Sequence, residues 1–371
     1  MPRRPVTHVR EMLENKKNVV QRRKQDHLRP FRDGQGVPGQ GSTWLEYVRL
    51  IHRALPELSL DEIDTTIDFA GHRFAVPFFV TGMTGGAREA RDINRDIARV
   101  ADRMGVGFGL GSQRAMLEDP RLCDTYEVRD VAPGVFLAGN IGGTQLVRTS
   151  LDRIRAMLKQ VQADALCVHL NPAQEMLQRE GDRDFGGICS AIEATVRDLG
   201  LPVIVKEVGA GISREVAMRL REIGVRHVDV AGAGGTSWVG VELLRSGETD
   251  DLEKGAFLDW GIPTAAALSD IEDAGFDLVA SGGIRTGLDA ARAIALGASL
   301  VGVASPLIQA WFREGEGGVE RVLRGMVEGL KTAMVLTGAR CIAELKAVPR
   351  VITGPLLEWR CQRGCTQGSM R

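Results

Sequence analysis

Eight short apolar runs recur between residues 75 and 303, and each is followed at once by small or polar residues. The runs are residues 75–80, 106–110, 135–138, 165–170, 203–205, 227–230, 278–280 and 300–303. Patterns typical of amphipathic helices lie between most of them. Short buried strands that alternate with such helices form parallel sheets, so the pattern predicts a (β/α)8 barrel, a TIM barrel. An open doubly wound sheet is the competing interpretation.

Three of the predicted helices show a clear apolar face. The faces are Ile93, Ile97, Val100 and Met104; Ile154, Met157, Leu158 and Val161; and Val216, Leu220 and Ile223, the last opened by Ser213. The stretch between the sixth and seventh strands is longer than the others, and we expect residues 239–274 to form an excursion near the active face.

Residues 277–305 carry the first functional signal. A buried run stops at Ser281-Gly282-Gly283, and a helix follows with Thr286 as its N-cap and Asp289 three residues on, as in a capping box. Leu288, Ala291, Ile294 and Ala298 lie near one face of that helix. Glycines allow backbone N–H groups to approach an anion, and the last two strands of (β/α)8 enzymes often hold phosphate. The segment predicts a phosphate site. The alternative is a structural turn without a ligand, in which the glycines only allow the backbone conformation.

Bulk properties set limits on partners and compartment. The chain has 371 residues and a formal net charge of −1, which implies no general affinity for nucleic acid or anionic membranes. No apolar run approaches the length of a membrane span, and the N-terminus lacks the apolar core of a secretory signal. The six cysteines show no metal-binding spacing, and Cys361 and Cys365 are expected as free thiols in a polar tail. We therefore expect a cytoplasmic protein.

The chain divides into one large domain and two end segments. We predict a flexible basic extension at residues 1–21, a single barrel domain at 22–364 and a tail at 365–371. Residues 33–42 are rich in glycine and are expected to form a mobile loop. Residues 45–67 are expected to hold short helices and turns that lead into the core.

The residues that follow the strands form the predicted mouth of the barrel. Thr84, Ser112, Asn140 and Lys206 are mostly hydrogen-bond donors that suit a flat, electron-accepting ring such as a flavin. Lys206 would stabilise negative charge on the ring, and its alternative role is a salt bridge to Glu207 or Asp229. No GxGxxG motif opens a Rossmann unit, which disfavours an ADP-bearing cofactor bound in that way. With a phosphate turn in the same barrel, FMN is the favoured cofactor.

Residues 169–175, HLNPAQE, form the second cluster. His169 ends the fourth strand and either faces the mouth or is a satisfied core histidine. Glu175 is a carboxylate near an expected anion, which suits Mg²⁺ because this ion binds phosphates together with one or two carboxylates. Its alternative role is a helix-start charge that complements the helix dipole.

A third cluster, Arg23-Lys24-x-x-His27, places three donors close together, which suits a diphosphate. A solvated surface is the alternative. Arg114, after Ser112-Gln113, could join this cluster from the mouth.

Together these segments resemble the type 2 isopentenyl diphosphate isomerases. The matching pieces are RKQDH (23–27), ALPEL (54–58), MTGG (83–86), GSQR (111–114), HLNPAQE (169–175), VKEVGAG (205–211), GAGGTSW (232–238), SGGIRTGLD (281–289) and VITGPLLEW (351–359). They cover roughly residues 22–364 in order. The extension before Arg22, the loop at 33–42 and the short tail depart from the pattern, but none of these touches the motifs.

The resemblance implies an isomerase of isoprenoid biosynthesis that interconverts isopentenyl and dimethylallyl diphosphate, with FMN reduced by NAD(P)H and with Mg²⁺. It further implies a homo-oligomer, a tetramer or octamer. The implied FMN residues are Gly82, Met83, Thr84, Ser112, Asn140, Lys206, Thr236, Gly282, Gly283, Ile284, Arg285, Ala304 and Ser305. The implied substrate residues are Arg23, Lys24, His27, Ser112, Gln113, Arg114, His169, Asn171 and Gln174, and Glu175 would bind Mg²⁺.

The implied reaction is a 1,3-proton shift through a transition state with carbocation character. An electron-rich reduced flavin would stabilise that charge and carry the proton through N5, because the mouth offers no strong acid besides Glu175. Gln174 and His169 are the side chains expected to act with it, Gln174 as a positioning or relay group. Two other functions remain open: an FMN-dependent hydroxy-acid oxidase, although no histidine follows His227, and a barrel that binds a phosphorylated ligand without catalysis.

Overall fold

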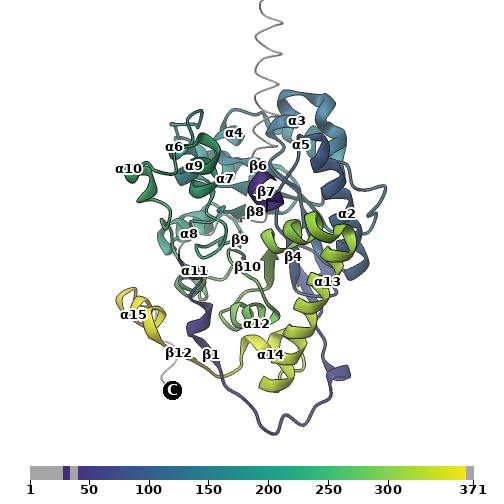
Figure 1. Ribbon diagram of the computed structural model, residues 1–371, viewed down its shortest axis with the longest axis vertical. Coiled ribbons are helices and arrows are strands. Elements are labelled where there is room, and N and C mark those ends of the chain that lie inside the picture. Colours follow the sequence, from purple (N-terminus) through teal and green to yellow (C-terminus); the bar gives the residue numbers. More distant parts are fainter. Residues whose placement is uncertain (1–27, 34–40, 365–371) are drawn as a thin grey trace, which may run out of the picture.

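The computed structural model describes residues 28–33 and 41–364. Within these residues, parallel strands close into a barrel in the order β10-β11-β4-β5-β6-β7-β8-β9 (Figure 1). The strands are β4 (Phe78–Val80), β5 (Gly107–Gly109), β6 (Leu137–Gly142), β7 (Ala165–His169), β8 (Val203–Lys206), β9 (His227–Asp229), β10 (Asp277–Ala280) and β11 (Leu300–Val303). Each predicted apolar run overlaps one of them. The pairing of Val301 with Phe78 closes the sheet, which confirms the barrel over the open sheet.

Helices connect the strands and surround the barrel (Figure 1). They are α2 (Arg88–Met104), α3 (Arg114–Glu118), α4 (Gly143–Val147), α5 (Leu151–Val161), α6 (Pro172–Leu177), α7 (Ile188–Asp198), α8 (Arg214–Glu222), α9 (Trp238–Ser246), α10 (Leu252–Gly255), α11 (Thr264–Ile271), α12 (Gly287–Ala295), α13 (Ser305–Thr337), α14 (Ile342–Lys346) and α15 (Gly354–Gln362), with a 3-10 turn at η3 (Pro120–Thr125). The long excursion between strands is confirmed as α9 and α10, which precede the barrel helix α11. In the described part of the chain, no helix has the length and apolarity needed to cross a membrane.

The predicted helix starts are correct, but two predicted apolar positions are wrong. Thr286 and Asp289 form the capping box of α12, and the side chain of Ser213 accepts a hydrogen bond from the Val216 nitrogen at the start of α8. Leu288 is 44 % exposed and Val216 is 42 % exposed. Both lie in the first turn of a helix, and their side chains face solvent.

The N-terminal ends of the barrel strands are closed by aromatic rings. A hairpin of β2 (Ile67–Phe69) and β3 (His72–Phe74) places Phe69 and Phe74 against Phe79 and Phe136, with the Phe74 and Phe136 centroids 5.2 Å apart. Gly107 makes room for them: a Cβ there would lie 2.6 Å from the Phe79 ring and 2.7 Å from the Phe74 ring. The sequence did not predict this hairpin. We call this layer the floor.

Short elements outside the barrel join the two ends of the described chain. They are η1 (Leu45–Tyr47), β1 (Val48–Leu50), η2 (Leu60–Glu62) and β12 (Arg350–Ile352), and β1 pairs with β12 in antiparallel fashion. The short helices expected at residues 45–67 are present, whereas strand β1 was not expected. Figure 1 shows β1, β12 and α15 side by side.

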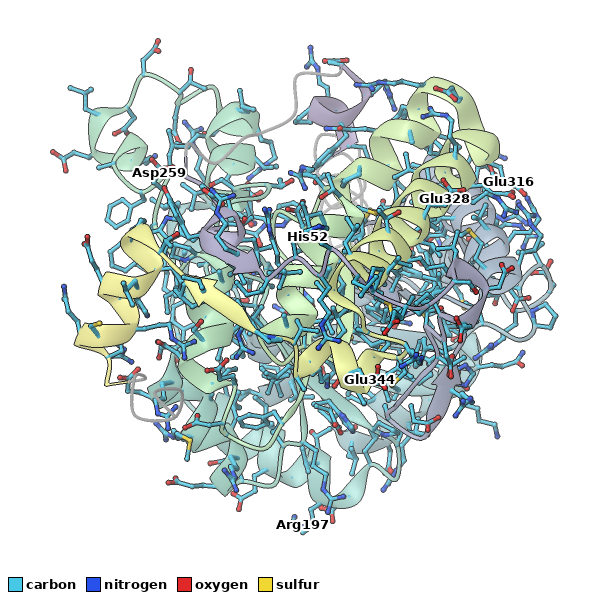
Figure 2. All side chains as sticks on the ribbon, turned by 90° about the horizontal axis from the view of Figure 1, so that it is seen from below. His52, Arg197, Asp259, Glu316, Glu328 and Glu344 are labelled. Carbon is cyan, nitrogen blue, oxygen red and sulfur yellow. The ribbon has the colours of Figure 1, made fainter. Side chains whose placement is uncertain are left out.

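Several predicted segments lie outside the described residues. These are the extension at 1–21, most of the loop at 33–42 and the tail at 365–371. Cys361 was expected in a tail but lies in α15, where it is exposed. Figure 2 labels charged side chains such as Arg197 and Asp259, and both are exposed.

Candidate functional site

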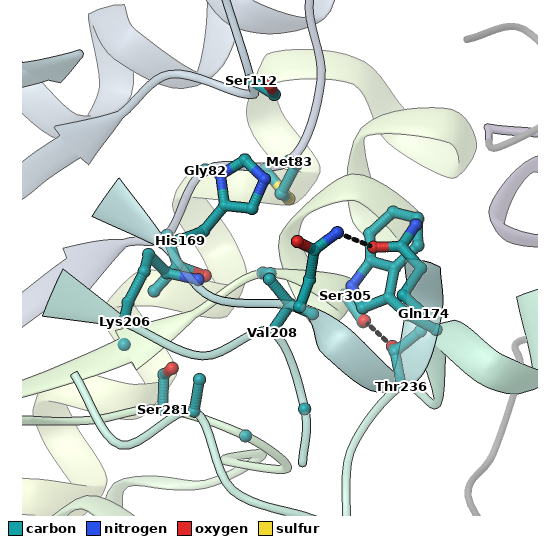
Figure 3. A pocket seen from close by; sticks show the side chains of 18 of the residues that line it. Gly82, Met83, Ser112, His169, Gln174, Lys206, Val208, Thr236, Ser281 and Ser305 are labelled. Carbon is teal, nitrogen blue, oxygen red and sulfur yellow. Dashed lines mark hydrogen bonds between the residues drawn. The ribbon is translucent and has the colours of Figure 1, made fainter. Parts of the chain in front are cut away.

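One cavity opens at the C-terminal ends of the barrel strands. Its empty volume is about 1450 Å³, counted to the open mouth, and residues from all eight strand ends line it. Lys206, Gln174 and the Ser281–Gly283 turn all face this space, as Figure 3 shows for the labelled side chains. The predicted convergence of distant polar residues on one mouth is therefore confirmed.

The sheet register explains the polar centre of the cavity. His169 pairs with Lys206, and Lys206 pairs with Asp229, so these three residues occupy one row across β7, β8 and β9. Side chains in one row of a parallel sheet point to the same face. That face is the barrel interior, because Cys167 and Ile204, two residues earlier on their strands, belong to the interior apolar cluster.

Lys206 is buried and presents its ammonium group to the cavity. It donates to the Glu207 carbonyl, and no ion pair to Glu207 or Asp229 is formed among the described residues. The Glu207 carboxylate instead accepts from the backbone nitrogens of Val208 (2.6 Å) and Gly209 (2.7 Å). Burial raises the pKa of Asp229, while Lys206 beside it and a hydrogen bond from Ser281 (2.6 Å) oppose that shift. The salt-bridge alternative for Lys206 is not supported, and its charge remains directed at the cavity.

The last two strands present backbone to the cavity as predicted. Gly282 (φ 97°) and Gly283 (φ 78°) adopt left-handed conformations that favour glycine, and both line the space. Helix α13 begins at Ser305, beside Ala304, and a non-helical residue, Gly315 (φ 61°), interrupts it further along. The Ser305 and Thr236 hydroxyls bond each other (Figure 3). Burial lowers the pKa of Arg285, which Asp289 partly offsets. Backbone donors, hydroxyls and a helix start make this part of the cavity suited to a phosphate. We call it the phosphate corner; it consists of Gly282 to Arg285, Ala304, Ser305 and Thr236.

His169 is oriented by Asn140. The Asn140 amide nitrogen donates to the Leu110 carbonyl (2.8 Å), so its oxygen must accept from Nδ1 of His169, which lies 2.8 Å away. Nδ1 therefore carries the hydrogen, and in the neutral ring Nε2 is an acceptor. His169 is thus buried and hydrogen-bonded, and it also lines the cavity. Both interpretations from the sequence, a satisfied core histidine and a residue that faces the mouth, describe it.

Gln174 and Glu175 belong to a hydrogen-bonded network. Asn171 donates to Gln174 Oε1 (3.1 Å) and to Glu175 Oε1 (3.1 Å), and Gln174 Nε2 donates to Glu242 Oε1 (3.1 Å). Glu175 Oε2 accepts from the Asp182 nitrogen (2.7 Å). Glu175 lies in the first turn of α6 and also lines the cavity, so its predicted ligand role and its helix-start alternative are geometrically compatible.

The buried carboxylate of Glu242 was not singled out from the sequence. It lies in α9, inside the excursion, and also accepts from Arg245 (2.7 Å). Its helical position resembles that of many surface glutamates, so no local signal distinguishes it. Only the folding of the excursion over α6 brings it to Gln174.

Two other groups of predicted residues differ in outcome. Arg114 lines the cavity and donates to Glu118 (2.8 Å), whereas Gln113 is fully buried in the wall, where its Oε1 accepts from the Asn140 nitrogen (2.9 Å). Gln113 is absent from the lining, so the structure places it behind the site. Arg23, Lys24 and His27 lie outside the described residues.

A short helical segment at residues 28–32 lies over the cavity and was not predicted. Leu28 and Phe31 are buried and belong to the lining, and Arg32 pairs with Glu89 and lies over the Phe312 ring. The spacing of Leu28 and Phe31, three residues apart, is a helical signal that could have been noticed. These apolar residues lie next in sequence to the basic cluster at 23–27.

The lining has the donor groups that a flavin nucleotide needs. A phosphate corner, a buried ammonium group and neutral donors lie around one space, which matches the two ends of FMN. No group of three or more His, Cys, Asp or Glu side chains in the described residues could hold a metal alone. A single carboxylate such as Glu175 suits Mg²⁺ when ligand phosphates complete its shell.

Comparisons with known proteins agree with this geometry. Residues 156–350 match the family of FMN-dependent dehydrogenases. Among solved structures, the chain is similar in fold to a variant mandelate oxidase with an FMN adduct (TM-score 0.62, 20% identity, 90% of this chain and 98% of that one). It is also similar to the flavin-binding domain of baker's yeast flavocytochrome b2 (TM-score 0.61, 20% identity, 82% and 76%).

Closer relatives cover nearly the whole chain. An isopentenyl-diphosphate delta-isomerase of Pyrococcus horikoshii is 43% identical over 339 residues, which are 89% of this chain and 91% of that one. The protein of the same name from Methanosarcina mazei is 44% identical over 352 residues, 94% and 96% of the two chains. The chain therefore belongs to the FMN-dependent, type 2 family of isopentenyl-diphosphate delta-isomerases.

Proposed function

We propose that this enzyme interconverts isopentenyl and dimethylallyl diphosphate by a 1,3-proton shift that requires reduced FMN and Mg²⁺, in isoprenoid biosynthesis. The observation that carries the proposal is the single cavity in which a phosphate corner, Lys206 and the Gln174–Glu175 pair meet. The names of the relatives supply the substrate pair. NADPH is the proposed reductant.

In this proposal the cavity would hold FMN. Gly282 to Arg285, Ala304, Ser305 and Thr236, which line the cavity, would hold its phosphate, and the Lys206 ammonium group would stabilise negative charge on the ring. The remaining proposed contacts are Gly82, Met83, Thr84, Ser112 and Asn140. When bound and reduced, the flavin would supply an electron-rich surface and an exchangeable proton beside the alkene.

The substrate diphosphate would bind in the same cavity beside the flavin. Arg114, Asn171 and Gln174 line this part of the cavity, and the basic cluster Arg23, Lys24 and His27 is proposed to complete it. Glu175 would hold Mg²⁺ with one carboxylate oxygen while the ion neutralises the diphosphate. This arrangement resolves the repulsion between a carboxylate and an anionic ligand.

The chain's own residues orient the reacting groups. Gln174 is fixed between Asn171 and Glu242, so its amide cannot rotate without breaking two hydrogen bonds. The acceptor nitrogen of His169 is held in place through Asn140. Leu28 and Phe31 line the mouth and would limit the access of water to an electron-deficient, carbocation-like transition state.

An anaerobic assay with FMN, NADPH and Mg²⁺ tests the proposed reaction. We expect isopentenyl diphosphate to be converted to dimethylallyl diphosphate only when the flavin is reduced, without consumption of further NADPH per turnover. Oxidation of a 2-hydroxy acid with no isomerisation would instead support the oxidase alternative. Binding of a phosphorylated ligand without either reaction would support a non-catalytic barrel.

The metal role has a separate test in Glu175→Gln. We expect the Mg²⁺ concentration needed for half-maximal substrate binding to rise about tenfold or more, because a neutral amide is a weaker ligand for a hard cation. FMN affinity, measured by quenching of flavin fluorescence, is expected to be unchanged. An unaltered Mg²⁺ requirement would remove Glu175 from the metal site.

A further inference from the structure

Ser42 and Thr43 pack against the turns at Gly234 and Gly283. A Cβ on Gly234 would lie 2.6 Å from the Thr43 Cα, and a Cβ on Gly283 would overlap the Thr43 γ-methyl group. Thr43 is absent from the cavity lining. Gly283 therefore lines the cavity and also contacts Thr43, whereas Gly234 contacts Thr43 and lies two residues before Thr236, which lines the cavity.

Hydrogen bonds fix this segment and the turns to the start of α11. The Thr43 carbonyl accepts from the Ala265 nitrogen (2.9 Å). The hydroxyl of the next residue toward the N-terminus, Thr264, lies 2.6 Å from the Gly282 carbonyl and 3.3 Å from the Ala233 carbonyl. The backbone of both turns and of the Thr43 segment thus depends on one helix start, and a shift of one part would move the others.

The C-terminal helix α15 holds the segment from outside. Trp359 meets Trp44 edge to face, with ring centroids 6.0 Å apart, and its indole N–H donates to the buried Asp270 of α11 (2.8 Å). Trp44 has a left-handed backbone (φ 61°), an unfavourable conformation for a residue with a bulky side chain. An external contact such as Trp359 can maintain such a conformation, because the packing of one ring on the other opposes its relaxation.

We propose that Thr43 and Trp359 are positioning residues for the phosphate corner, and that α15 thereby controls affinity for the phosphate of the cofactor. Neither residue touches the cavity, so each acts through the Gly234 and Gly283 turns. The proposal rests on the placement of the FMN phosphate given under Proposed function. It also assigns a role to a helix that lies beyond residue 350, where the match to the FMN-dependent dehydrogenases ends.

The test compares FMN with riboflavin, which lacks the phosphate, by fluorescence titration of the apoprotein. For Trp359→Ala we expect FMN affinity to fall about two- to tenfold, the scale of one aromatic pair, while riboflavin affinity stays unchanged. Trp359→Phe keeps an aromatic edge and is expected to restore most of the FMN affinity. Leu357→Ala, an exposed change on the same helix, is the matched control and is expected to leave both affinities unchanged.

A second pair of variants decides the matter if Trp359→Ala does not fold. Thr43→Val keeps the γ-methyl group that abuts Gly283 and is expected to bind FMN as the wild type does, whereas Thr43→Ala is expected to lose FMN affinity selectively. Equal loss for FMN and riboflavin, or no loss in Thr43→Ala, would overturn the proposal. If the wild type binds FMN and riboflavin equally, the proposed phosphate site itself is wrong, which is a different result.

Discussion

The floor and the mouth of this barrel are built on the same strands, two residues apart, yet they differ in almost every property. Inward residues of the floor are apolar, as Phe79, Ile204 and Val279 show. Two residues further along, the same strands present Thr81, Lys206 and Ser281 to the cavity. A distance of about 6.6 Å along a strand, two residues of rise, thus separates packed hydrocarbon from an open polar space.

This difference shows which part of the fold stabilises the protein and which part binds ligands. The floor is filled by packed aromatic rings, so a change there removes packing. The mouth holds buried charged and polar groups, which stabilise a protein weakly but can bind a ligand strongly. Floor variants should therefore lose stability and keep their affinity for FMN. Mouth variants should lose affinity for their ligands and keep their stability.

The largest expected effect is on the floor, with Phe74→Ala. Phe74 is fully buried against Phe69, His72 and Phe136, so we expect a loss of about 3–5 kcal/mol in the free energy of unfolding. Denaturant titration measures this loss, and the FMN affinity of the folded fraction should be unchanged. Phe257→Ala, at a ring that is 42 % exposed, is the matched control and should lose far less. Weakened FMN binding in Phe74→Ala would show that the floor and the mouth are coupled.

At the mouth, Lys206→Met should have the opposite outcome. Methionine keeps most of the side-chain length but lacks the charge, so we expect FMN affinity to fall about ten- to hundredfold, the scale of a charge-assisted hydrogen bond. Stability should not fall, because a buried ammonium group is replaced by an apolar one. Fluorescence titration and thermal unfolding measure the two quantities. Wild-type FMN affinity in this variant would separate Lys206 from the cofactor.

A smaller effect is expected within the mouth for Gln174→Ala. Gln174 contacts the network of Asn171 and Glu242, and we propose that it acts on substrate, so kcat should fall about tenfold while FMN affinity stays the same. Anaerobic steady-state kinetics with reduced FMN measure kcat. Full activity would remove Gln174 from the proposed mechanism.

The smallest effect is expected for Arg363, which pairs with Glu215 at the surface and with the buried Asp270 of α11 (3.4 Å). A hydrogen bond from its own backbone, together with Arg363, lowers the pKa of Glu215 to about 2 from 4.5. A lowered folded pKa stabilises the protein above pH 4.5, and this contribution is lost as the pH falls toward 2. In Arg363→Gln the melting temperature should decrease slightly at neutral pH, and the difference from wild type should vanish at low pH. A difference that persists at low pH would show that Arg363 acts by packing rather than by charge.

The sequence predicted the barrel and its mouth well because both depend on local patterns. Each strand is an apolar run with a polar end, and parallel strands place those ends at one rim, so Lys206 and Ser281 could be brought together without coordinates. Thr286 and Asp289 were recognisable for the same reason, since a capping box is complete within four residues.

The remaining features depend on contacts between distant segments, which no local pattern encodes. Strands of three residues, such as β2, β3 and β1, are too short to show alternation. Glu242 reaches Gln174 only because α9 folds over α6, and Gln113 turns into the wall because the Asn140 nitrogen lies there. Its neighbours Ser112 and Arg114 face the cavity, so a motif alone cannot separate the residues that line a site from those that support it.

The pairing of β11 with β4 has a consequence for how the molecule is synthesised. Val301 is made long after its partner Phe78, so a nascent chain holds β4 with one unpaired edge until most of the protein has left the ribosome. Pairing between such distant segments is slow, and exposed strand edges favour association between chains. Production of soluble protein should therefore depend on the rate of translation and on the availability of chaperones more than on the final stability of the fold.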